Sequence, residues 1–217
     1  MDLESRVRQY KDRLRIYLIL SFFSENYSDT TQPKLKKLFR SEVRIQKIDF
    51  LLRNPDYLAY ELLNIAKEDI NEKDNIKLVI RNIFNSKEPV IRRLEMERFF
   101  FGAYEDIDDV IGFLQSIDFI KFTSKKAADL KTIEKHYYLT DYGLTRLQTV
   151  LPTLPALKWY LQRCELIKKY FGDMTGTQLK VAQYRIKEYR EATYNSYISS
   201  ILDTVRTEFS IFYAESL

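Results

Sequence analysis

The sequence has very few of the residues that build metal sites, disulfides and phosphate-binding loops. Among its 217 residues there is one histidine, His136, and one cysteine, Cys164. A zinc site usually takes three or four nitrogen and sulfur ligands, so this pair excludes such a site and leaves only carboxylate metal sites open. One cysteine also excludes an internal disulfide. The five glycines form neither GxGxxG nor GxxxxGK followed by Ser or Thr, so we expect no nucleotide, metal or other cofactor.

Long hydrophobic runs are missing too. The run near the start, Ile16 to Phe23, has eight residues, whereas a helix needs about 20 to cross a bilayer. The opening residues, MDLESRVRQYKDR, are charged where a secretory signal would be apolar. We therefore expect a cytoplasmic protein that makes no membrane contact.

Catalytic motifs are equally scarce. No GxSxG sequence occurs, Cys164 lies between Arg163 and Glu165 in an amphipathic segment, and His136 opens a predicted strand. A structural role explains both His136 and Cys164 better than catalysis does. Carboxylate pairs such as Asp108 and Asp109 are too common in charged helices to indicate acid-base chemistry. The sequence predicts that the protein is not an enzyme.

The chain does have the composition of a folded protein, with unevenly spread charge. Apolar residues make up 45% and charged residues 30%, which is typical of a globular chain. The net charge of +4 divides into +4 over residues 1–60, −5 over 61–120 and +5 over 121–217. An acidic middle between mildly basic ends favours contacts with complementary proteins over a nucleic-acid-binding stripe.

Hydrophobic spacing predicts helices at both ends of the chain. From Leu3 to Glu25, apolar residues recur every three or four positions, which predicts a helix with one buried face. This face would contain Val7, Tyr10, Leu14, Tyr17 and Leu18. Further helices are predicted over residues 34–53, from Pro55 onward, and over 90–101. Between Gln178 and about Tyr213 there is no proline or glycine, and the apolar spacing predicts one long helix that needs another surface to bury its stripe.

The middle of the chain has the pattern of a winged helix. The segment YEDIDDVIGFLQSIDFI has helical spacing, FIKFTS and KHYYLT alternate as strands, and TDYGLTRLQTVL predicts a closing helix with Thr140 as its N-cap. Helix, helix, hairpin, helix is the winged-helix order. We therefore expect a mainly α protein with a small β-hairpin, divided into an N-terminal helical region (1–86), a winged-helix core (87–151) and a C-terminal helical region (152–217) with the long helix.

The predicted recognition helix has the wrong charge for DNA. Residues 99–120 include five acidic side chains and no lysine or arginine. Asp106 and Asp109 can be explained by the helix dipole, which favours negative charge at an N-terminus, or by simple solvation. Neither explanation accounts for the absence of basic residues. Because duplex phosphates would repel this face, the pattern favours a protein partner.

The candidate partner-binding residues combine this acidic segment with aromatic side chains, which supply contact area at little entropic cost. They are Tyr104, Asp106, Asp108, Asp109, Tyr194, Tyr197, Phe209 and Phe212. The wing loop offers four lysines against Asp129 and Glu134, which keeps a loop soluble and leaves nonspecific phosphate contact as the alternative. These lysines are Lys125, Lys126, Lys131 and Lys135. The basic residues of the N-terminal helix have the same two interpretations.

Three segments together resemble a known group of proteins. They are KIDFLLRNPDYL (Lys47 to Leu58), RFFFGAYEDIDDVIGFLQSIDFI (Arg98 to Ile120) and KWYLQRCELIKKYFGDMTGTQLKVAQY (Lys158 to Tyr184). The chain resembles the middle component of bacterial three-component ABC ATPase systems, the Lamassu-type antiphage defence operons. The resemblance covers most of the chain and rests on apolar and aromatic patterns.

This resemblance implies a noncatalytic adaptor subunit that joins an SMC-like ABC ATPase, which senses DNA, to an effector subunit that is often a nuclease. It implies contact with nucleic acid only indirectly or nonspecifically, and no catalytic residues. It places Ile48, Asp49, Phe50 and Leu51 in a helical motif of the family, and Tyr104, Asp106 and Asp109 in its winged-helix motif. The alternative is a winged-helix transcription regulator, which would need a basic recognition helix or a dimer that spaces two half-sites.

Overall fold

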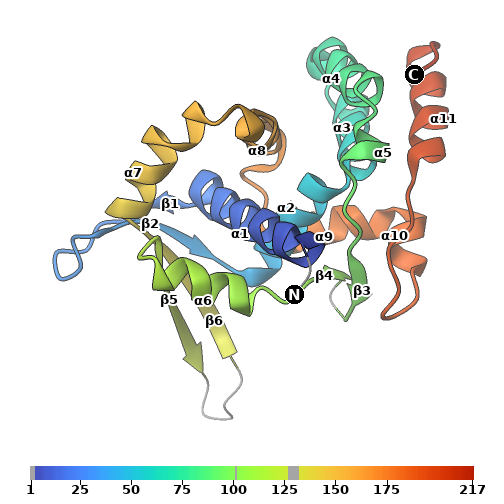
Figure 1. Ribbon diagram of the computed structural model, residues 1–217. Helices are drawn as coiled ribbons and strands as arrows, with labels where there is room; N and C mark the ends of the chain where they lie inside the picture. The colour runs from blue at the N-terminus through green and yellow to red at the C-terminus, as the bar shows by residue number, and fades with distance from the viewer. Residues whose placement is uncertain (1–2, 101, 127–131) are drawn as a thin grey trace. The chain divides into compact units, whose positions relative to one another are not determined.

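The protein is mostly helical, with a small antiparallel sheet (Figure 1). The computed structural model describes residues 3–100, 102–126 and 132–217. Its helices are α1 Leu3–Phe23, α2 Glu42–Arg53, α3 Pro55–Glu68, α4 Lys73–Asn85, α5 Glu88–Ile91, α6 Asp108–Ser116, α7 Asp141–Thr149, α8 Lys158–Phe171, α9 Gly176–Arg185, α10 Lys187–Glu191 and α11 Leu202–Tyr213. Its strands are β1 Glu25–Asn26, β2 Leu35–Arg40, β3 Glu97–Phe99, β4 Gly102–Tyr104, β5 Ile120–Lys126 and β6 Thr132–Thr140. Within these ranges, no helix combines the length and apolar composition that a bilayer crossing requires.

The chain forms two compact units, each built from two separate stretches. Unit 1 contains residues 1–49 and 106–176, and unit 2 contains residues 50–105 and 177–217. The division between residues 49 and 50 falls inside α2. The sequence-based division into 1–86, 87–151 and 152–217 uses contiguous segments and stays a prediction.

Unit 1 is built around a sheet with the strand order β1-β2-β6-β5, antiparallel throughout. The predicted hairpin forms between β5 and β6, with Phe122 opposite Tyr137. The predicted helices on either side of it also form, as α6 and α7. Thr140 caps α7 as expected, because its Oγ1 accepts a hydrogen bond of 3.0 Å from the Gly143 amide. The helix–hairpin–helix part of the prediction is therefore confirmed.

A buried ion pair joins α1 to α2 in unit 1. Arg15 Nε donates to Asp49 Oδ1 over 2.8 Å, and both side chains are only 2% exposed. Asp12 contributes a second carboxylate 2.8 Å from the guanidinium, and these carboxylates help to raise the pKa of Arg15 although burial alone would lower it. Because a buried charge is stable only when it is paired, this contact helps to fix how the two helices meet.

Leu35–Arg40 forms strand β2 and not the start of the predicted helix over 34–53. The segment LKKLFR pairs with β6, with Leu38 opposite Tyr138, and its buried Leu35 and Leu38 belong to the core. Ser41 then has a φ of 78°, which separates the strand from α2. A short apolar run fits either state, and here pairing with a strand about 100 residues away decides it.

Unit 2 has an aromatic core. Tyr57 and Tyr189 lie edge-on to Phe50, with ring centroids 4.8 and 5.1 Å away. Both hydroxyls are satisfied: Tyr57 donates to the Ser199 carbonyl over 2.8 Å, and Tyr189 accepts from the Ala103 amide over 2.7 Å. These bonds attach residues from both stretches of unit 2 to one core.

The predicted long helix over residues 178–213 is wrong. The structure has α9, α10 and α11, separated by non-helical residues 192–201. Asn195 has a φ of 60°, and its amide donates to the Arg98 carbonyl over 2.8 Å. Asp56 then accepts 2.9 Å from the Ile201 amide, at the start of α11. Pairing with distant residues competes successfully with a helical pattern that no proline or glycine interrupts.

The predicted helix over residues 90–101 is wrong for a similar reason. α5 ends at Ile91, and Glu97–Phe99 forms strand β3 against β4. On its other side, the Arg98 amide of β3 donates to the Ser196 carbonyl over 2.8 Å. The Arg53 guanidinium holds the connecting segment, donating 3.2 Å to the Leu94 carbonyl and pairing with Glu105.

Candidate protein-interaction surfaces

The acidic face of α6, defined here as Asp106, Asp108 and Asp109, lies on the surface of unit 1. Ile111 and Leu114 bury the opposite side of the helix. All three aspartates are exposed, and the Asp108 side chain is 80% exposed. The remaining exposed residues of α6 are Gly112, Gln115 and Ser116, which are uncharged. The outward side of this helix therefore presents negative charge alone.

Part of this acidity has a structural explanation. Asp106 Oδ1 accepts a hydrogen bond of 2.9 Å from the Asp108 amide, which closes the turn that leads into α6. Asp108 and Asp109 lie in the first helical turn, where the helix dipole favours carboxylates. The Asp108 carboxylate also lies 3.9 Å from Lys135 Nζ. Asp109 makes no ion pair within the described part of the chain. The turn formed by Asp106 and the helix dipole explain why carboxylates occur here, but they do not explain why the other exposed residues of α6 include no lysine or arginine.

The lysines of the β5–β6 hairpin are partly neutralised by neighbouring carboxylates. Lys135 forms an ion pair with Glu42 and is 26% exposed, and Lys125 lies 3.7 Å from Glu134 with 74% exposed. The side chain of Lys126 and the whole of Lys131 lie outside the described residues. The described lysines therefore form no continuous cationic surface next to α6.

The aromatic patch, defined here as Phe99, Phe100, Tyr104 and Tyr194, is an exposed cluster of rings on unit 2. Phe99 stacks on Tyr104 and on Tyr194, with ring centroids 5.4 and 5.3 Å apart. Phe100 lies 4.9 Å from Tyr194. The exposed fractions are 36% for Phe99, 70% for Phe100 and 45% for Tyr194, which is unusual for stacked apolar rings.

Backbone hydrogen bonds of strand β3 bring the residues of the aromatic patch together. The β3–β4 hairpin supplies Tyr104 and the phenylalanines, and the segment after α10 supplies Tyr194. Tyr197, 54% exposed, forms a β-bridge to Glu97 on the same strand. The candidates Tyr104, Tyr194 and Tyr197 therefore all lie beside strand β3, although 90 residues separate the first two in the sequence.

Phe99 and Phe100 are not among the candidates predicted from the sequence, because both fall in the predicted helix over residues 90–101. The signal was the run FFF directly before Gly102, because three consecutive rings cannot share one face of a helix. Gly102 has a φ of 101°, a conformation that favours glycine, and it begins β4.

Phe209 and Phe212 do not belong to this patch. Phe209 is fully buried, with its ring centroid 4.6 Å from that of Tyr213, so its side chain is not available to another chain. Phe212 is half-buried, and Lys73 Nζ lies 4.9 Å from its ring centroid. Both residues contribute to the packing of α11 inside unit 2. The expectation that Phe209 binds another chain is therefore wrong, because its side chain is buried in this one.

Cys164 is a buried free cysteine, and His136 lies on strand β6. Burial raises the pKa of Cys164 to about 12, which keeps the thiol protonated and unreactive. His136 Nε2 lies 3.3 Å from Glu134 on the same strand. Across the described ranges, no group of three or more His, Cys, Asp or Glu side chains could hold a metal ion.

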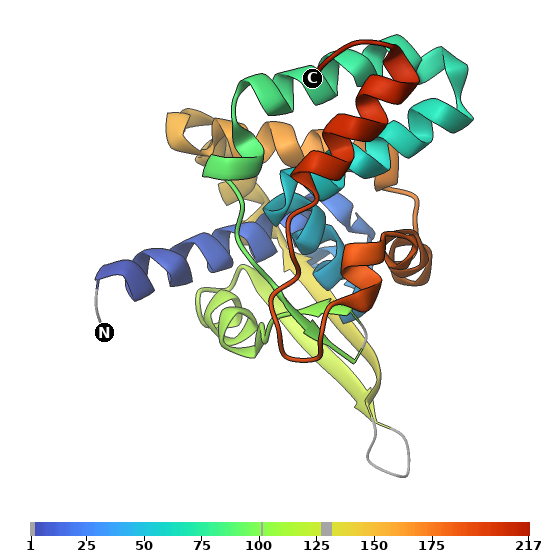
Figure 2. The same cartoon turned by 90° about the vertical axis from the view of Figure 1, so that its right-hand side faces the viewer.

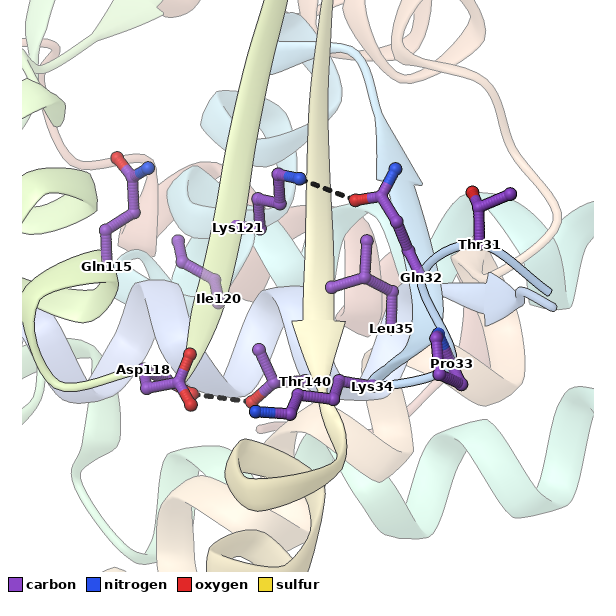
Figure 3. Close-up of a pocket in the computed structure, with 10 residues that line it drawn as sticks. All are labelled: Thr31, Gln32, Pro33, Lys34, Leu35, Gln115, Asp118, Ile120, Lys121 and Thr140. Atoms are coloured by element: carbon purple, nitrogen blue, oxygen red, sulfur yellow. Dashed lines mark hydrogen bonds between the residues drawn. The ribbon is translucent and has the colours of Figure 1, made fainter. Parts of the chain in front are cut away.

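A depression of about 550 Å³ lies at one end of the sheet in unit 1 (Figure 3). Two hydrogen bonds join residues of its lining: Lys121 Nζ donates to Gln32 Oε1 over 2.5 Å, and Thr140 Oγ1 donates to the Asp118 backbone carbonyl over 2.6 Å. Thr140 also caps α7 from this position. The depression is therefore described by the residues that end the strands of the sheet, and we propose no ligand for it.

Comparison with known proteins adds no relative: no family model, no curated protein and no solved structure matches the chain.

Proposed function

We propose that this protein is a noncatalytic adaptor subunit of an SMC-like ABC ATPase antiphage defence complex. It would join the ATPase to an effector subunit, often a nuclease, through protein contacts. The observation that carries the proposal is the acidic face of α6, exposed on unit 1 with no cation among the outward residues of that helix. Duplex DNA carries one phosphate charge per ~1.7 Å of helix axis, so such a face binds a cationic protein surface far better.

The proposal includes a winged-helix core in unit 1. The order α1, β2, α2, α6, β5, β6 corresponds to helix, strand, helix, helix, hairpin, and the sheet order β2-β6-β5 places the first strand beside the last, as in winged helices. In this assignment α6 is the recognition helix. Two features depart from the simplest form: residues 54–105 of unit 2 lie between the second and third helices in the chain, and β1 extends the sheet.

An adaptor needs two contact surfaces, and the aromatic patch supports a second one. Stacked rings with exposed fractions of up to 70% are the type of surface that protein interfaces bury at their centres. Because the patch belongs to unit 2 and the acidic face to unit 1, each partner would have its own unit. The resemblance to the defence subunits supplies the identity of the two partners, the ATPase and the effector.

Co-expression with the products of the neighbouring genes tests the proposal. We expect a tagged chain to retain an SMC-like ATPase on purification, and the variant Asp108→Lys/Asp109→Lys to lose a partner. A matched control is Glu165→Lys/Asp173→Lys, which makes the same charge change at two exposed positions of unit 1. If the wild-type chain elutes alone and shifts a promoter fragment in a gel, the DNA-binding regulator is the better description.

A further inference from the structure

The first half of α1 is exposed, whereas its second half is buried. Every residue from Arg6 to Lys11 is exposed, whereas Arg15 to Leu20 are all buried. Figure 2 shows these first turns, in dark blue, extending past α6 of the same unit. The sequence-based expectation that Val7 and Tyr10 are buried is therefore wrong within this chain. The predicted apolar stripe is present, but its outer part is exposed.

The exposed stripe continues the buried one. Leu3, Val7, Tyr10 and Leu14 follow each other at spacings of four, three and four residues, and Tyr17, only 4% exposed, is the next member. Leu3 is 78% exposed, Val7 43% and Tyr10 64%. The same apolar stripe that packs α1 into unit 1 therefore continues outward as exposed apolar surface over about two helical turns.

The seam is narrow, which favours a partner helix over a membrane. Arg6 and Arg8 flank Val7, and Gln9 and Lys11 flank Tyr10, so only two positions in seven are apolar. A strict two-in-seven stripe is the seam of a coiled coil, whereas helices that lie in a membrane interface carry a broad apolar face.

The charged residues beside the apolar stripe indicate which charge a partner helix should carry. With Val7 and Leu14 at heptad position a, the flanking e and g positions are Glu4, Arg6, Lys11 and Arg13, three basic and one acidic. Arg13 lies over the Phe113 ring of α6, 3.8 Å from its centroid, while Arg6 and Lys11 are exposed. A second copy of this mainly basic helix would repel the first, and a helix with acidic flanks would attract it.

We propose that the first half of α1 docks an α-helix of another protein, one whose apolar seam is flanked by Asp and Glu side chains. This goes beyond the proposed function, because it assigns unit 1 a second surface of opposite charge to the acidic face of α6. It does not depend on what α6 binds.

Two synthetic three-heptad peptides test this inference. Both carry Leu at a and d, and one has Glu and the other Lys at every e and g position, so like charges keep each from pairing with itself. Labelled peptide is titrated with the full chain and followed by fluorescence anisotropy. We expect the Glu peptide to bind at least about tenfold more tightly than the Lys peptide. Val7→Ser/Tyr10→Ser should weaken binding of the Glu peptide at least about tenfold.

Charge reversal makes the test specific. Arg6→Glu/Lys11→Glu changes two exposed side chains and should transfer the preference to the Lys peptide, with an unchanged circular dichroism spectrum. Asp108→Lys/Asp109→Lys should leave peptide binding intact, which separates this inference from the proposed role of α6. Equal affinity for both peptides would overturn the inference. So would binding of phosphatidylserine vesicles or duplex DNA by a chain that ignores the Glu peptide.

Discussion

Unit 1 and unit 2 differ in what stabilises their interiors and in what they expose. Unit 1 buries the Arg15–Asp49 ion pair and exposes the carboxylates of α6, whereas unit 2 buries hydrogen-bonded tyrosines and exposes the aromatic patch. Charged surfaces act over about a Debye length, ~10 Å at 0.1 M salt, and are screened as salt rises. Apolar rings act on contact and depend little on salt. We therefore expect partner binding by unit 1 to weaken with salt far more than partner binding by unit 2.

The largest expected effect breaks the core of unit 1. Asp49→Ala removes the buried partner of Arg15, which is 2% exposed, and leaves it paired with the partly exposed Asp12, so it should lower the free energy of unfolding by about 4 kcal/mol. The matched control is the exposed pair Arg40–Glu25, whose side chains are 54% and 69% exposed. Arg40→Ala should cost less than about 1 kcal/mol in the same urea titration. Equal losses of stability in the two variants would show that burial does not make the Arg15–Asp49 pair more stabilising than the exposed pair.

The next effect is a pH dependence in unit 2. Burial raises the pKa of Glu61 from its ordinary 4.5 to about 7, although Arg185 opposes the shift. The folded chain therefore keeps this proton to higher pH than the unfolded chain, so the contribution of Glu61 to stability is greatest below pH 4.5 and is lost as the pH rises to about 7. The loss should reach about 3 kcal/mol.

Glu61→Gln should remove most of this loss, because glutamine cannot ionise, so the variant should be more stable than wild type at pH 8. The measurement is urea unfolding at pH 5 and pH 8. Glu191→Gln, an exposed position of the same unit, is the control and should leave the pH profile unchanged. A variant profile as steep as that of wild type would rule out Glu61 as its source.

A smaller loss is expected at Asp56, which binds the residues just before α11. Asp56 is fully buried and accepts hydrogen bonds of 2.7 Å from Ser200 Oγ and 2.9 Å from the Ile201 amide. Asp56→Ala leaves that amide without its acceptor and should cost about 2 kcal/mol in thermal or urea unfolding. Ser200→Ala removes one bond only and should cost about 1 kcal/mol.

The smallest effect on stability is expected at the aromatic patch. Phe100 is 70% exposed, so Phe100→Ala should change the free energy of unfolding by less than about 0.5 kcal/mol. The same substitution should weaken binding of the unit 2 partner by about 2 kcal/mol, measured by titration calorimetry. Phe209→Ala is the contrasting variant, because its ring is buried and should cost about 3 kcal/mol of stability. A Phe100 variant that binds normally would remove the patch from the interface.

The sequence predicted what local spacing controls. Residues 108–126 and 132–149 formed the expected helix, paired strands and capped helix, because the apolar spacing of Ile111 and Leu114 and the capping by Thr140 are local features of the sequence. The strand β2 and the break at residues 192–201 were not predictable in this way. Both depend on backbone hydrogen bonds to residues about 100 positions away, which leave no periodic signal in the segment itself.

The candidate surfaces show the same limit. Exposure of Asp108 and Asp109 followed from their place at a helix start, so spacing was enough. The meeting of Tyr104 with Tyr194 required the fold, since both stack on Phe99 from separate stretches of unit 2. Phe209 shows the reverse error, because a helical stripe of rings does not reveal which rings the same chain will bury.

Photo-crosslinking from α6 tests the central claim most directly. A photoreactive amino acid at Gln115, exposed on the outward side of α6, is irradiated in cells that express the native gene neighbourhood. Our account predicts a covalent adduct with another polypeptide, which is absent when the group is placed at Glu165 on α8. An adduct with DNA, or none with any protein, would contradict it.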